Sequence, residues 1–459
     1  MSDDTLFNKI TSLAKRRGFV YPSSEIYGGF QATYDYGPLG ALLTKNIKDL
    51  WWQHFITEPT NMIGMDGAIF SHPKTWEASG HVESFNDPLV EDKVTHIRYR
   101  ADKLVEANLG IDTAKLTFEE LNKLIKDNQI KSPEGNPLTE VKQFNLLVQA
   151  QLGSTEETKE KAYLRGETCQ IIFIQFLNLL NFVGGKLPFG VGQIGKAFRN
   201  EITVKQFILR TREFQQMETE YFVQPGNDME AYEVWKKLLI TFFTKKLGLP
   251  EKDFRYREVA GKEKSHYAKV QNDLEFKTRS ADWVELSPLN HRGDYDLSRH
   301  SQFSNQSLTA FDTESQRRYT PYVIETSIGL DRTVYAILDA FYSEDKERMV
   351  LKLPAQLAPY KIAVFPLLRN KPELVKKAQE VYRSLPKKWS VVWDDRGNIG
   401  KRYYAQDEIG TPWCVTVDFD TLKGNTVTVR DRDTTKQERI DVVKLGSYFE
   451  KKLRMMIYE

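Results

Sequence analysis

The stretch GKAFRNEITVKQFILRTREFQQMETEYFV, residues 195–223, decides the fold of this chain. It predicts two antiparallel strands, yet it contains four carboxylates and five basic side chains. Because side chains alternate along a strand, the first strand directs Arg199 and Glu201 to one face. The second strand likewise has one polar face, made of Phe214, Gln216, Glu218 and Glu220. Charge inside a sheet is costly unless it meets a ligand, so these faces are predicted to line a cavity. The alternative is a solvated sheet surface.

Composition limits what the chain can be. Its 459 residues are 40% hydrophobic and 28% charged, which is typical of a globular protein of two or three domains. No apolar run approaches the roughly 20 residues that cross a bilayer, and the first 20 residues contain no signal-peptide core, so we expect a cytoplasmic protein with no membrane partner. With only Cys169 and Cys414, a disulfide framework and a four-cysteine zinc site are excluded.

Positive charge is concentrated at the C-terminal end. Residues 360–459 contain 20 Lys and Arg against 14 Asp and Glu, a net charge of +6, whereas the preceding 359 residues carry −4. This asymmetry favours a nucleic-acid contact in the C-terminal part. A solvated basic surface is the alternative.

A proline-containing segment, LPAQLAPY at 353–360, divides the chain into a large body and a smaller C-terminal part. Within the body, residues 98–160 are interpreted as an insertion, in which Thr117 and Glu120 form a capping box that starts a short helix. Downstream of the division, the pattern predicts a small α/β domain. Its expected elements are a strand at 362–368, a helix at 371–385, and strands at 390–393, 413–419 and 426–429.

Two further segments carry polar groups that point to a ligand. In PYVIETSIGLDRTVYAILDAFY, residues 321–342, a strand, a glycine turn and a helix direct Arg332 and backbone N–H groups toward the strand end, which suits an anion such as phosphate. Glu325 and Ser327 share a face there and could hold a small polar substrate. In KAYLRGETCQ, residues 161–170, the Glu167 carboxylate could receive an ammonium group. The alternative is a surface ion pair between Arg165 and Glu167, worth at most about 1 kcal/mol.

Together these segments resemble the class II aminoacyl-tRNA synthetases, and within them the glycyl-tRNA synthetases of the homodimeric type. FRNE with REFQQME is similar to the second class-defining motif and ETSIGLDR to the third. The helix and strand of Ala41 to Pro73 are similar to the first motif, which builds the dimer interface in this class. Segments similar to the glycine enzymes in particular are YGGFQATYDYGPLG, WEASGHV, RYRAD, LRGETCQ, KLPFGVGQIGKAFRNE, HYAK and DEIGTPWCVTVDFDT.

The resemblance implies an α/β (α+β) fold. A catalytic domain with an antiparallel β-sheet flanked by helices would carry an insertion and be followed by a C-terminal α/β anticodon-binding domain. It assigns 1–97 to the N-terminal part of the catalytic domain with motif 1, 98–160 to the insertion, 161–355 to the catalytic domain with motifs 2 and 3, and 356–459 to the anticodon-binding domain.

The resemblance also implies an activity: ATP converts glycine to glycyl-adenylate, and the glycyl group is then transferred to the 3′ end of tRNA(Gly). Arg199 would hold the α-phosphate, Glu201 the adenine amino group, and Arg332 the γ-phosphate; these are the expected catalytic residues. Glu285 would bind Mg²⁺ with ATP. The full expected ATP site is Arg199, Asn200, Glu201, Leu209, Arg210, Thr211, Arg212, Glu213, Phe214, Glu285, Leu286, Gly329, Leu330, Asp331 and Arg332.

For glycine, the resemblance implies a tight site around the ammonium group that excludes alanine sterically. The expected residues are Arg100, Glu167, Phe214, Gln215, Gln216, Met217, Glu218, Glu325, Thr326, Ser327, Ile328 and Gly329. The expected partners are tRNA(Gly), glycine, ATP and a second copy of the chain. Zinc is not expected, because the insertion lacks the paired cysteines that some relatives carry.

Several positions depart from the family pattern. The family's LRPETAQG corresponds to Leu164–Ile171 here, so Gly166, Cys169 and Ile171 replace proline, alanine and glycine, and Thr326 replaces a proline in the third motif. Two alternatives to a glycine enzyme stay open. One is a non-catalytic, synthetase-like nucleic-acid-binding subunit of the DNA polymerase accessory type, and the other is a class II synthetase for another amino acid.

Overall fold

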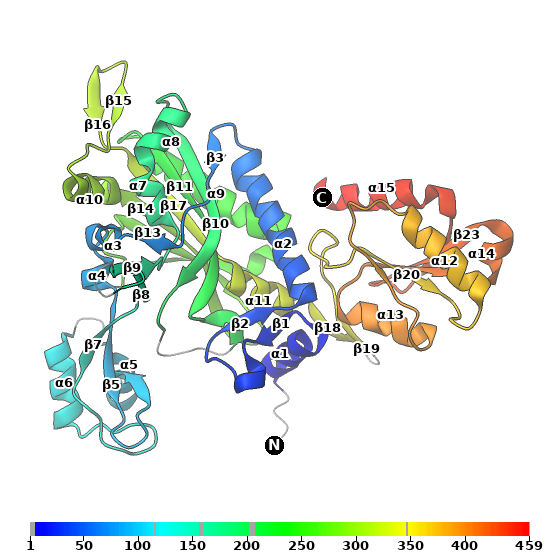
Figure 1. The fold of residues 1–459 in the computed structure, drawn as a ribbon, viewed down its shortest axis with the longest axis horizontal. Coiled ribbons are helices and arrows are strands. Elements are labelled where there is room, and N and C mark those ends of the chain that lie inside the picture. The colour runs from blue at the N-terminus through cyan, green and yellow to red at the C-terminus, as the bar shows by residue number, and fades with distance from the viewer. Residues whose placement is uncertain are drawn as a thin grey trace.

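The computed structural model describes residues 5–113, 116–155, 159–201, 207–261, 263–345 and 348–458, with side chains up to residue 453. Figure 1 shows a large body built on one sheet, a small unit that extends from it, and a C-terminal domain beside it. Within the described part of the chain, no helix has the length and apolar character needed to cross a bilayer. The cytoplasmic location stays a prediction.

A seven-stranded sheet forms the centre of the large body. Its strands pair antiparallel, except that the edge strand β3 runs parallel to β10. In sheet order they are β12 (Phe254–Glu258), β13 (Val270–Lys277), β14 (Trp283–Gly293), β17 (Tyr322–Gly329), β11 (Glu213–Val223), β10 (Phe189–Phe198) and β3 (Met62–Gly64). The strand pair predicted from residues 195–223 is therefore β10 and β11, in the interior of the sheet.

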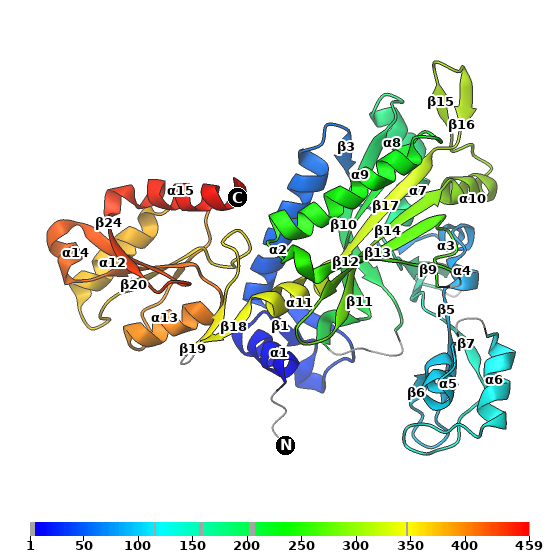
Figure 2. The ribbon, with the colours of Figure 1, turned by 180° about the vertical axis from the view of Figure 1, so that it is seen from behind.

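One face of this sheet is apolar and covered by long helices. Met217 of β11 and Ile328 of β17 are buried in the main hydrophobic core, which these helices complete. Figure 2 shows α9 lying across this face. The helices are α1 (Leu6–Arg17), α2 (Pro38–Trp52, continued by a π-helical turn at Gln53–Thr57), α9 (Asp228–Thr241) and α11 (Leu330–Phe341). The helix expected within Ala41 to Pro73 is thus α2, which starts earlier because Pro38 suits a first helical turn.

The opposite face carries the polar side chains, and shorter helices close over it. Cys169, Phe173 and Phe222 contribute to a second apolar cluster at its far end. The helices are α3 (Pro73–Ala78), α4 (His81–Ser84), α7 (Cys169–Ile174), α8 (Phe176–Phe182) and α10 (Tyr295–Ser304). Strand pairs at the margins are β1 (Val20–Pro22) with β2 (Tyr34–Tyr36), β15 (Ala310–Asp312) with β16 (Arg317–Tyr319), and β18 (Tyr342–Asp345) with β19 (Arg348–Leu351).

The first strand of the 195–223 stretch ends sooner than the alternation predicted. β10 stops at Phe198, because Arg199 N–H donates to the Arg212 carbonyl whereas Asn200 N–H turns away to the Leu146 carbonyl. Glu201 N–H then donates to the Arg199 carbonyl at 2.7 Å, so the chain bends there. Ile202, placed on the first strand by the alternation, lies outside the described residues.

The insertion is a separate small unit with its own core around Val105, Leu121 and Ile125. Its helix α6 (Phe118–Asp127) begins with the capping box of Thr117 and Glu120, so this prediction is confirmed. Its sheet starts at β5, upstream of residue 98. The other elements are β5 (Asn86–Glu91), β6 (Arg98–Arg100), β7 (Lys142–Asn145) and α5 (Ala101–Leu109), and a neighbouring sheet contains β4 (Phe70–Ser71), β8 (Gln149–Leu152) and β9 (Glu160–Leu164).

The C-terminal domain has the α/β order expected from the sequence. Its sheet runs β21, β20, β22, β23, β24, with β20 parallel to both β21 and β22. The strands are β20 (Ile362–Pro366), β21 (Val391–Trp393), β22 (Trp413–Val417), β23 (Thr426–Asp431) and β24 (Gln437–Asp441), and the helices are α12 (Pro372–Ser384), α13 (Ile399–Glu408), α14 (Phe419–Gly424) and α15 (Leu445–Tyr458).

Ion pairs join the C-terminal domain to the body. Asp407 of α13 is fully buried and pairs with Arg430 of β23 at 2.9 Å and with Arg348 of β19 in the body. Glu408 pairs with Arg16 of α1 at 2.9 Å. Removing one partner of a buried ion pair leaves an uncompensated charge. The ion pairs of Asp407 are therefore predicted to be essential for the interface between the C-terminal domain and the body.

Asp407→Asn is therefore predicted to lower the free energy of unfolding by about 3–5 kcal/mol, because Arg348 and Arg430 lose their buried anion. Asp420→Asn is the matched control, since its carboxylate is exposed and pairs with a half-exposed Arg439; it is expected to cost less than about 1 kcal/mol. Urea denaturation followed by tryptophan fluorescence measures both. Equal stability of the two variants would contradict the importance of the buried pair.

Candidate active site

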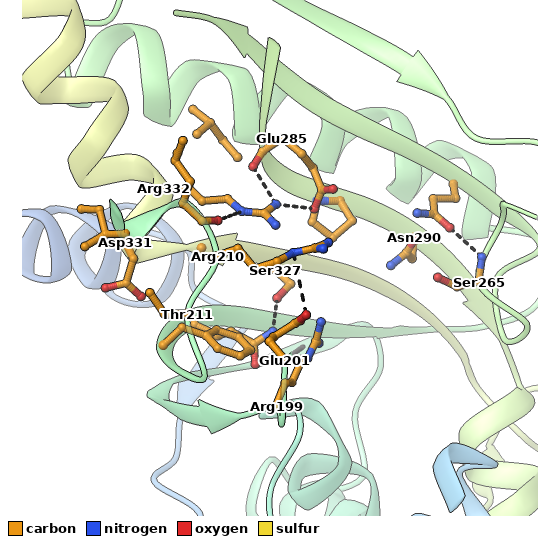
Figure 3. A pocket seen from close by; sticks show the side chains of 18 of the residues that line it. Arg199, Glu201, Arg210, Thr211, Ser265, Glu285, Asn290, Ser327, Asp331 and Arg332 are labelled. Atoms are coloured by element: carbon orange, nitrogen blue, oxygen red, sulfur yellow. Dashed lines mark hydrogen bonds and ion pairs between the residues drawn. The ribbon is translucent and has the colours of Figure 1, made fainter. Parts of the chain in front are cut away.

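A cavity of about 300 Å³ opens on the polar face of the central sheet. Arginines and carboxylates line it together, and Figure 3 shows Arg199, Arg210 and Arg332 directed into it from three different segments. The lining residues that the sequence had marked are Arg199, Glu201, Leu209, Arg210, Thr211, Phe214, Gln216, Glu285, Leu286, Ser327, Gly329, Asp331 and Arg332. The prediction that a polar strand face lines a cavity is confirmed for Phe214 and Gln216 of β11, whereas Arg199 and Glu201 line the cavity from beyond the end of β10.

Each arginine is held by a neighbour but keeps part of its guanidinium toward the cavity. Arg199 donates to the Gly166 carbonyl at 3.0 Å and stacks over Phe214, 5.2 Å from the ring centre. Arg332 donates to the Glu285 carboxylate at 3.1 Å, and Arg210 lies 3.9 Å from the Glu201 carboxylate. Three cations around one cavity suit a ligand with several negative charges.

The turn from β17 to α11 fixes Arg332. Gly329 precedes the helix, and Asp331 in its first turn is buried and accepts from the Gln215 N–H at 2.8 Å and from the Tyr36 hydroxyl. Burial raises the pKa of Asp331, while these hydrogen bonds oppose the shift. Asp331 thus ties the start of α11 to β11, and this contact places Arg332 over the cavity.

Beyond Gln216 and Ser327 lies a cluster of buried carboxylates. Glu218 and Glu220 of β11 lie beside Ser327 and Glu325 of β17 in register, and Glu325 lies beside Asn290 of β14. All four acidic or hydroxyl groups are less than a tenth exposed. An antiparallel register therefore gathers charges from separate strands into one interior site.

One arginine balances part of this charge. Arg292 of β14 is 1% exposed; it donates to Glu325 at 2.9 Å and makes a two-pronged pair with Asp296 at 2.7 and 2.8 Å. The guanidinium also stacks over the Tyr267 ring at 3.6 Å. Asn290 donates a further hydrogen bond to Glu325 at 2.8 Å. Glu325 is therefore held as an acceptor with its partners fixed.

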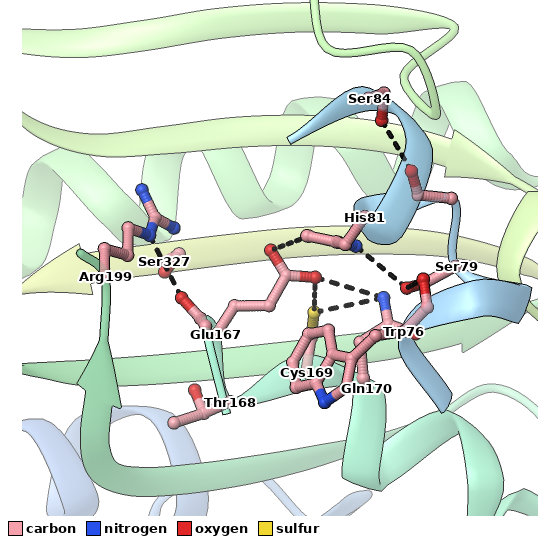
Figure 4. Close-up of polar contacts among 12 residues, drawn as sticks. Trp76, Ser79, His81, Ser84, Glu167, Thr168, Cys169, Gln170, Arg199 and Ser327 are labelled. Atoms are coloured by element: carbon pink, nitrogen blue, oxygen red, sulfur yellow. Dashed lines mark hydrogen bonds and ion pairs between the residues drawn. The ribbon is translucent and has the colours of Figure 1, made fainter. Parts of the chain in front are cut away.

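Glu167 forms the other wall of the cluster, as Figure 4 shows. Its carboxylate accepts from Gln170 at 3.0 Å and from the Cys169 thiol at 2.9 Å, and it pairs with His81 at 3.2 Å. Both Arg165 and Glu167 are buried, and Arg165 donates instead to backbone carbonyls of Gly67 and Lys196. The alternative of a surface ion pair between them is wrong. A side chain at Gly195 would clash with Arg165 at 2.1 Å, so this strand needs glycine there.

The carboxylates of the cluster titrate differently. Burial opposes the ionisation of Glu167, but its interaction and hydrogen bond with His81, together with the charge of Arg292, outweigh burial and hold its pKa well below the usual range. Burial, Glu325 and Glu167 raise the pKa of Glu218 to about 8. Burial and the same Glu325 raise the pKa of Glu220 well above its usual value. A positive ligand would relieve this repulsion, so the site is suited to a cation.

Comparison with known proteins identifies the family. Models of the tRNA synthetase class II core domain (G, H, P, S and T) and of the anticodon binding domain match residues 150–341 and 361–452. The chain is 45% identical over 457 residues to the glycine–tRNA ligase of Bacillus anthracis, with 97% of this chain and 99% of that protein covered. The glycine–tRNA ligases of Lachnospira eligens and Clostridium kluyveri are 45% and 44% identical, with 97% and 99% of this chain and 98% and 100% of those proteins covered.

The chain belongs to the glycine–tRNA ligase family. It is thus an enzyme of the class II aminoacyl-tRNA synthetases, as the motifs indicated. In fold it is similar to a prolyl-tRNA synthetase from Cryptosporidium parvum complexed with halofuginone and AMPPNP, with a TM-score of 0.66, 15% identity, and 99% of this chain and 78% of that chain covered. The expected α/β fold with an antiparallel catalytic sheet and an anticodon-binding domain is confirmed.

The structure separates the expected ligase residues into groups. Four residues lie near the cavity but do not line it. Glu213 pairs with Lys196, Arg212 donates to the Glu201 carbonyl, and Leu330 is packed in the main core; Asn200 is held by its backbone bond to Leu146. In the glycine group, Glu167, Glu218 and Glu325 gather in the buried cluster, with Phe214, Gln216, Ser327 and Gly329 on the cavity side.

Several expected glycine-binding side chains face elsewhere. Met217 and Ile328 belong to the apolar core, and Thr326 bonds to Thr219 at 2.7 Å on that same face. Gln215 follows Phe214 and precedes Gln216 on β11, so alternation turns it to the opposite face too. The interpretation had assigned a whole motif to the ligand, whereas a strand presents only every second residue to it.

Arg100, which the resemblance places near the glycine site, has other partners in this structure. It pairs with Asp87 at 3.0 Å and with Asp102 at 2.6 Å at the base of the insertion, rather than with the buried glutamates. Burial is the largest single influence on the Arg100 pKa and lowers it. The carboxylates of Asp102, Asp87 and Glu201 together outweigh burial, so the pKa of Arg100 is raised. Arg100 therefore lies toward the Glu201 side of the site.

Sequence reasoning missed Arg292 and Asp296, and it did not connect His81 with the site. Arg292 and Asp296 stand four residues apart in HRGDYD, after a buried strand, and this spacing was the available signal. His81 appeared as an isolated histidine in the sequence. Its partner Glu167 lies 86 positions downstream, so only the fold brings the two together.

The raised pKa of Glu218 predicts a pH dependence of stability. Its carboxyl keeps its proton in the folded state up to about pH 8 but loses it near 4.5 when unfolded. The stabilisation by the proton is therefore complete below about pH 4.5 and is lost as the pH rises toward 8, by up to about 1.4 kcal/mol per pH unit. Glu218→Gln should abolish this part of the slope, measured by urea denaturation across pH 5–8. Glu213→Gln, at the exposed end of the same strand, is the control; parallel curves for wild type and Glu218→Gln would contradict the prediction.

Proposed function

We propose that this chain activates glycine with ATP to form glycyl-adenylate and pyrophosphate, and then transfers the glycyl group to the 3′ end of tRNA(Gly). One observation carries the proposal: a cavity lined by three arginines adjoins a cluster of buried carboxylates, which lies beyond the lining residues Gln216 and Ser327. This distribution matches a polyanionic nucleotide joined to an amino acid with a free ammonium group. A binding subunit without catalysis has no need of this arrangement.

Triphosphate binding is assigned to the arginines. Arg199 would hold the α-phosphate, Arg210 and Arg332 the outer phosphates, and Phe214 would stack on adenine while Glu201 accepts from its amino group. Each charge-assisted contact is worth roughly 1.5–3 kcal/mol. The glycine carboxylate oxygen would then attack the α-phosphorus in line with the departing pyrophosphate, so that catalysis consists of positioning and neutralising charge.

Magnesium is proposed to accompany ATP at Glu285. Mg²⁺ prefers oxygen ligands and is often held by one or two carboxylates together with substrate phosphates. The Glu285 side chain is 40% exposed at the cavity and faces Arg332, so its oxygens are accessible to such an ion. The donor set therefore fits. When bound, the ion would neutralise phosphate charge, and Glu285 would orient it.

The ammonium group of glycine is assigned to the carboxylate cluster. Glu218, Glu325 and Ser327 would surround it, with Glu167 holding the far wall through His81. Arg292 positions Glu325 by donating a hydrogen bond to its carboxylate at 2.9 Å. Discrimination against alanine would rest on the lack of space for a methyl group, because an added methylene changes attraction by only about 1–3 kcal/mol.

The C-terminal domain is proposed to bind the anticodon of tRNA(Gly). Its charge of +6 and its match to the anticodon binding domain support this role. The same proposal divides the chain into functional parts that begin at residues 98, 161 and 356. It also includes a cytoplasmic location. Zinc is proposed to play no part in the reaction.

Glycine-dependent exchange of pyrophosphate into ATP tests the first step, and charging of tRNA(Gly) tests the second. Exchange is expected with glycine and not with alanine. Arg199→Ala should slow exchange by about 10²–10³-fold or more, because it removes a charge that stabilises the transition state. Arg318→Ala, on an exposed strand away from the cavity, is the matched control.

The outcomes separate the alternatives. No exchange with any amino acid would refute an enzymatic role, and exchange with another amino acid alone would refute the glycine assignment. Full activity of Arg199→Ala would overturn the role given to that side chain. If pyrophosphate exchange occurs with glycine but tRNA(Gly) is not charged, the assignment of tRNA(Gly) as the substrate is wrong.

A homodimer through the first motif is part of the proposal. An apolar groove of about 590 Å³ lies between β3 and α9, lined by Pro59, Leu187, Val234 and Trp235 among others. Val234 is 51% exposed, and Trp52 of α2, which lies against Gly64 of the edge strand β3, is 37% exposed. Exposed apolar surface at a sheet edge is typical of an interface between subunits.

Val234→Asp is predicted to convert the dimer to monomers at micromolar concentration, because it buries a charge in the interface. Sedimentation equilibrium measures the change in mass. Val443→Asp is the control, since Val443 is 78% exposed in the C-terminal domain. A monomeric wild type, or a dimer unaffected by Val234→Asp, would refute this interface.

A further inference from the structure

A thiol lies inside the carboxylate cluster. Cys169 begins α7 and is fully buried, and the family pattern has alanine at this position. Its sulfur donates to Glu167 at 2.9 Å and lies 3.7 Å from the Gln170 amide nitrogen. A free buried cysteine is ordinarily an inert packing residue. Here, however, it faces charged groups from two strands.

The sulfur belongs to a group of four potential metal ligands. Sγ of Cys169 and one carboxylate oxygen from each of Glu218, Glu220 and Glu325 all lie within 4.8 Å of one another. The four atoms come from α7, β11 and β17, so three separate elements fix them. In tetrahedral zinc sites the ligand atoms are roughly 3.5 Å apart, given metal distances of about 2.0–2.3 Å. Each pair of atoms would therefore have to approach by no more than about 1.3 Å to reach this spacing.

Glu220 supplies an independent indication of a missing ligand. It is fully buried, and within the described part of the chain neither of its carboxylate oxygens has a hydrogen-bond partner. An unsatisfied buried carboxyl group is costly. Its register position opposite Glu325 directs it into the group rather than toward the apolar core.

We propose that Cys169, Glu218, Glu220 and Glu325 form a binding site for Zn²⁺ in which the ion competes with the amino-acid ammonium group. A mixed thiolate and carboxylate set favours a borderline-soft divalent ion over Mg²⁺ or Ca²⁺, which prefer oxygen ligands alone. The ion site is inferred from the side chains themselves, and only the competition rests on the proposed function. Zinc is then an inhibitor of this chain, not a cofactor of it.

Binding must displace protons. Burial and the carboxylates of Glu167 and Glu218 raise the pKa of the Cys169 thiol, and burial and neighbouring carboxylates raise that of Glu220. Arg292 opposes both shifts, and Asp296 adds to that of Glu220. A metal ligand has to be deprotonated, so any Zn²⁺ ion bound here would take the place of protons on these groups.

Zinc binding to the full chain, freed of metal and without substrates, tests the site. Titration with Zn²⁺ against a chromophoric chelator is expected to show one bound ion. Cys169→Ala should weaken its affinity at least about tenfold, because even indirect partners of metal ligands cost 10–100-fold when removed. Cys414→Ala is the matched control, since Cys414 is also buried but lies on β22. Absence of zinc binding, or equal affinity of Cys169→Ala and wild type, would overturn the proposal.

A second variant and a competition experiment complete the test. Glu220→Gln keeps the size of the side chain and removes its anionic oxygen, so zinc affinity should again fall; unchanged affinity would exclude Glu220 from the site. Circular dichroism verifies that both variants are folded. Glycine is expected to weaken apparent zinc affinity in proportion to its concentration. If zinc binds through Cys169 and glycine leaves its affinity unchanged, the proposal that zinc and glycine compete is wrong. A failure of glycine-dependent exchange alone would instead count against the proposed function.

Discussion

Charge buried in the interior of an antiparallel sheet is the constraint on which the rest of this structure depends. Arg292, Glu325 and Asp296 are almost completely removed from solvent. Each isolated ion would cost several kcal/mol, and only close pairing and additional hydrogen bonds offset that cost. The elements that supply the partners, β14, β17 and α10, therefore have to adopt one relative position. Specificity for a single arrangement of the sheet follows from the polar cluster, while net stability comes from the apolar face.

The register of β11 against β17 joins these two requirements. Met217 and Ile328 lie on the apolar side, and Glu218 and Ser327, their neighbours in sequence, lie on the polar side. A slip by one residue would move a glutamate into the main core and a methionine into the site. The large apolar core thus holds the carboxylates in place, and the same backbone pairing serves stability on one face and chemistry on the other.

A feature of the fold or the site could be predicted from the sequence when the residues that form it lie within one segment of the chain. Alternation along β11 identified Gln216 and Glu218, and the strand, turn and helix around Gly329 identified Arg332, because both patterns lie within one segment. The pairing of His81 with Glu167, or of Arg292 with Glu325, depends on topology that periodicity does not contain. The resemblance to a family supplied ligand roles, yet by assigning whole motifs it included Met217 and Ile328, whose side chains turn away. The role given to Arg100 stays a prediction, and its partners in this structure are Asp87 and Asp102 at the base of the insertion.

The frame of the cavity extends to the C-terminal domain through α1. Arg16 of this helix pairs with Glu408 of α13, and Phe7 near its start packs against Tyr335 of α11 with ring centres 5.6 Å apart. The first turn of α11 contains Asp331 and Arg332 at the cavity, so α1 contacts both the C-terminal domain and the helix that carries a cavity-lining arginine. These contacts join closely packed helices, and closely packed protein interiors have low compressibility, so the helices keep fixed positions relative to one another. The contacts through α1 therefore fix the distance between the basic C-terminal domain and the cavity. A single long nucleic acid that contacts both would require such a fixed distance.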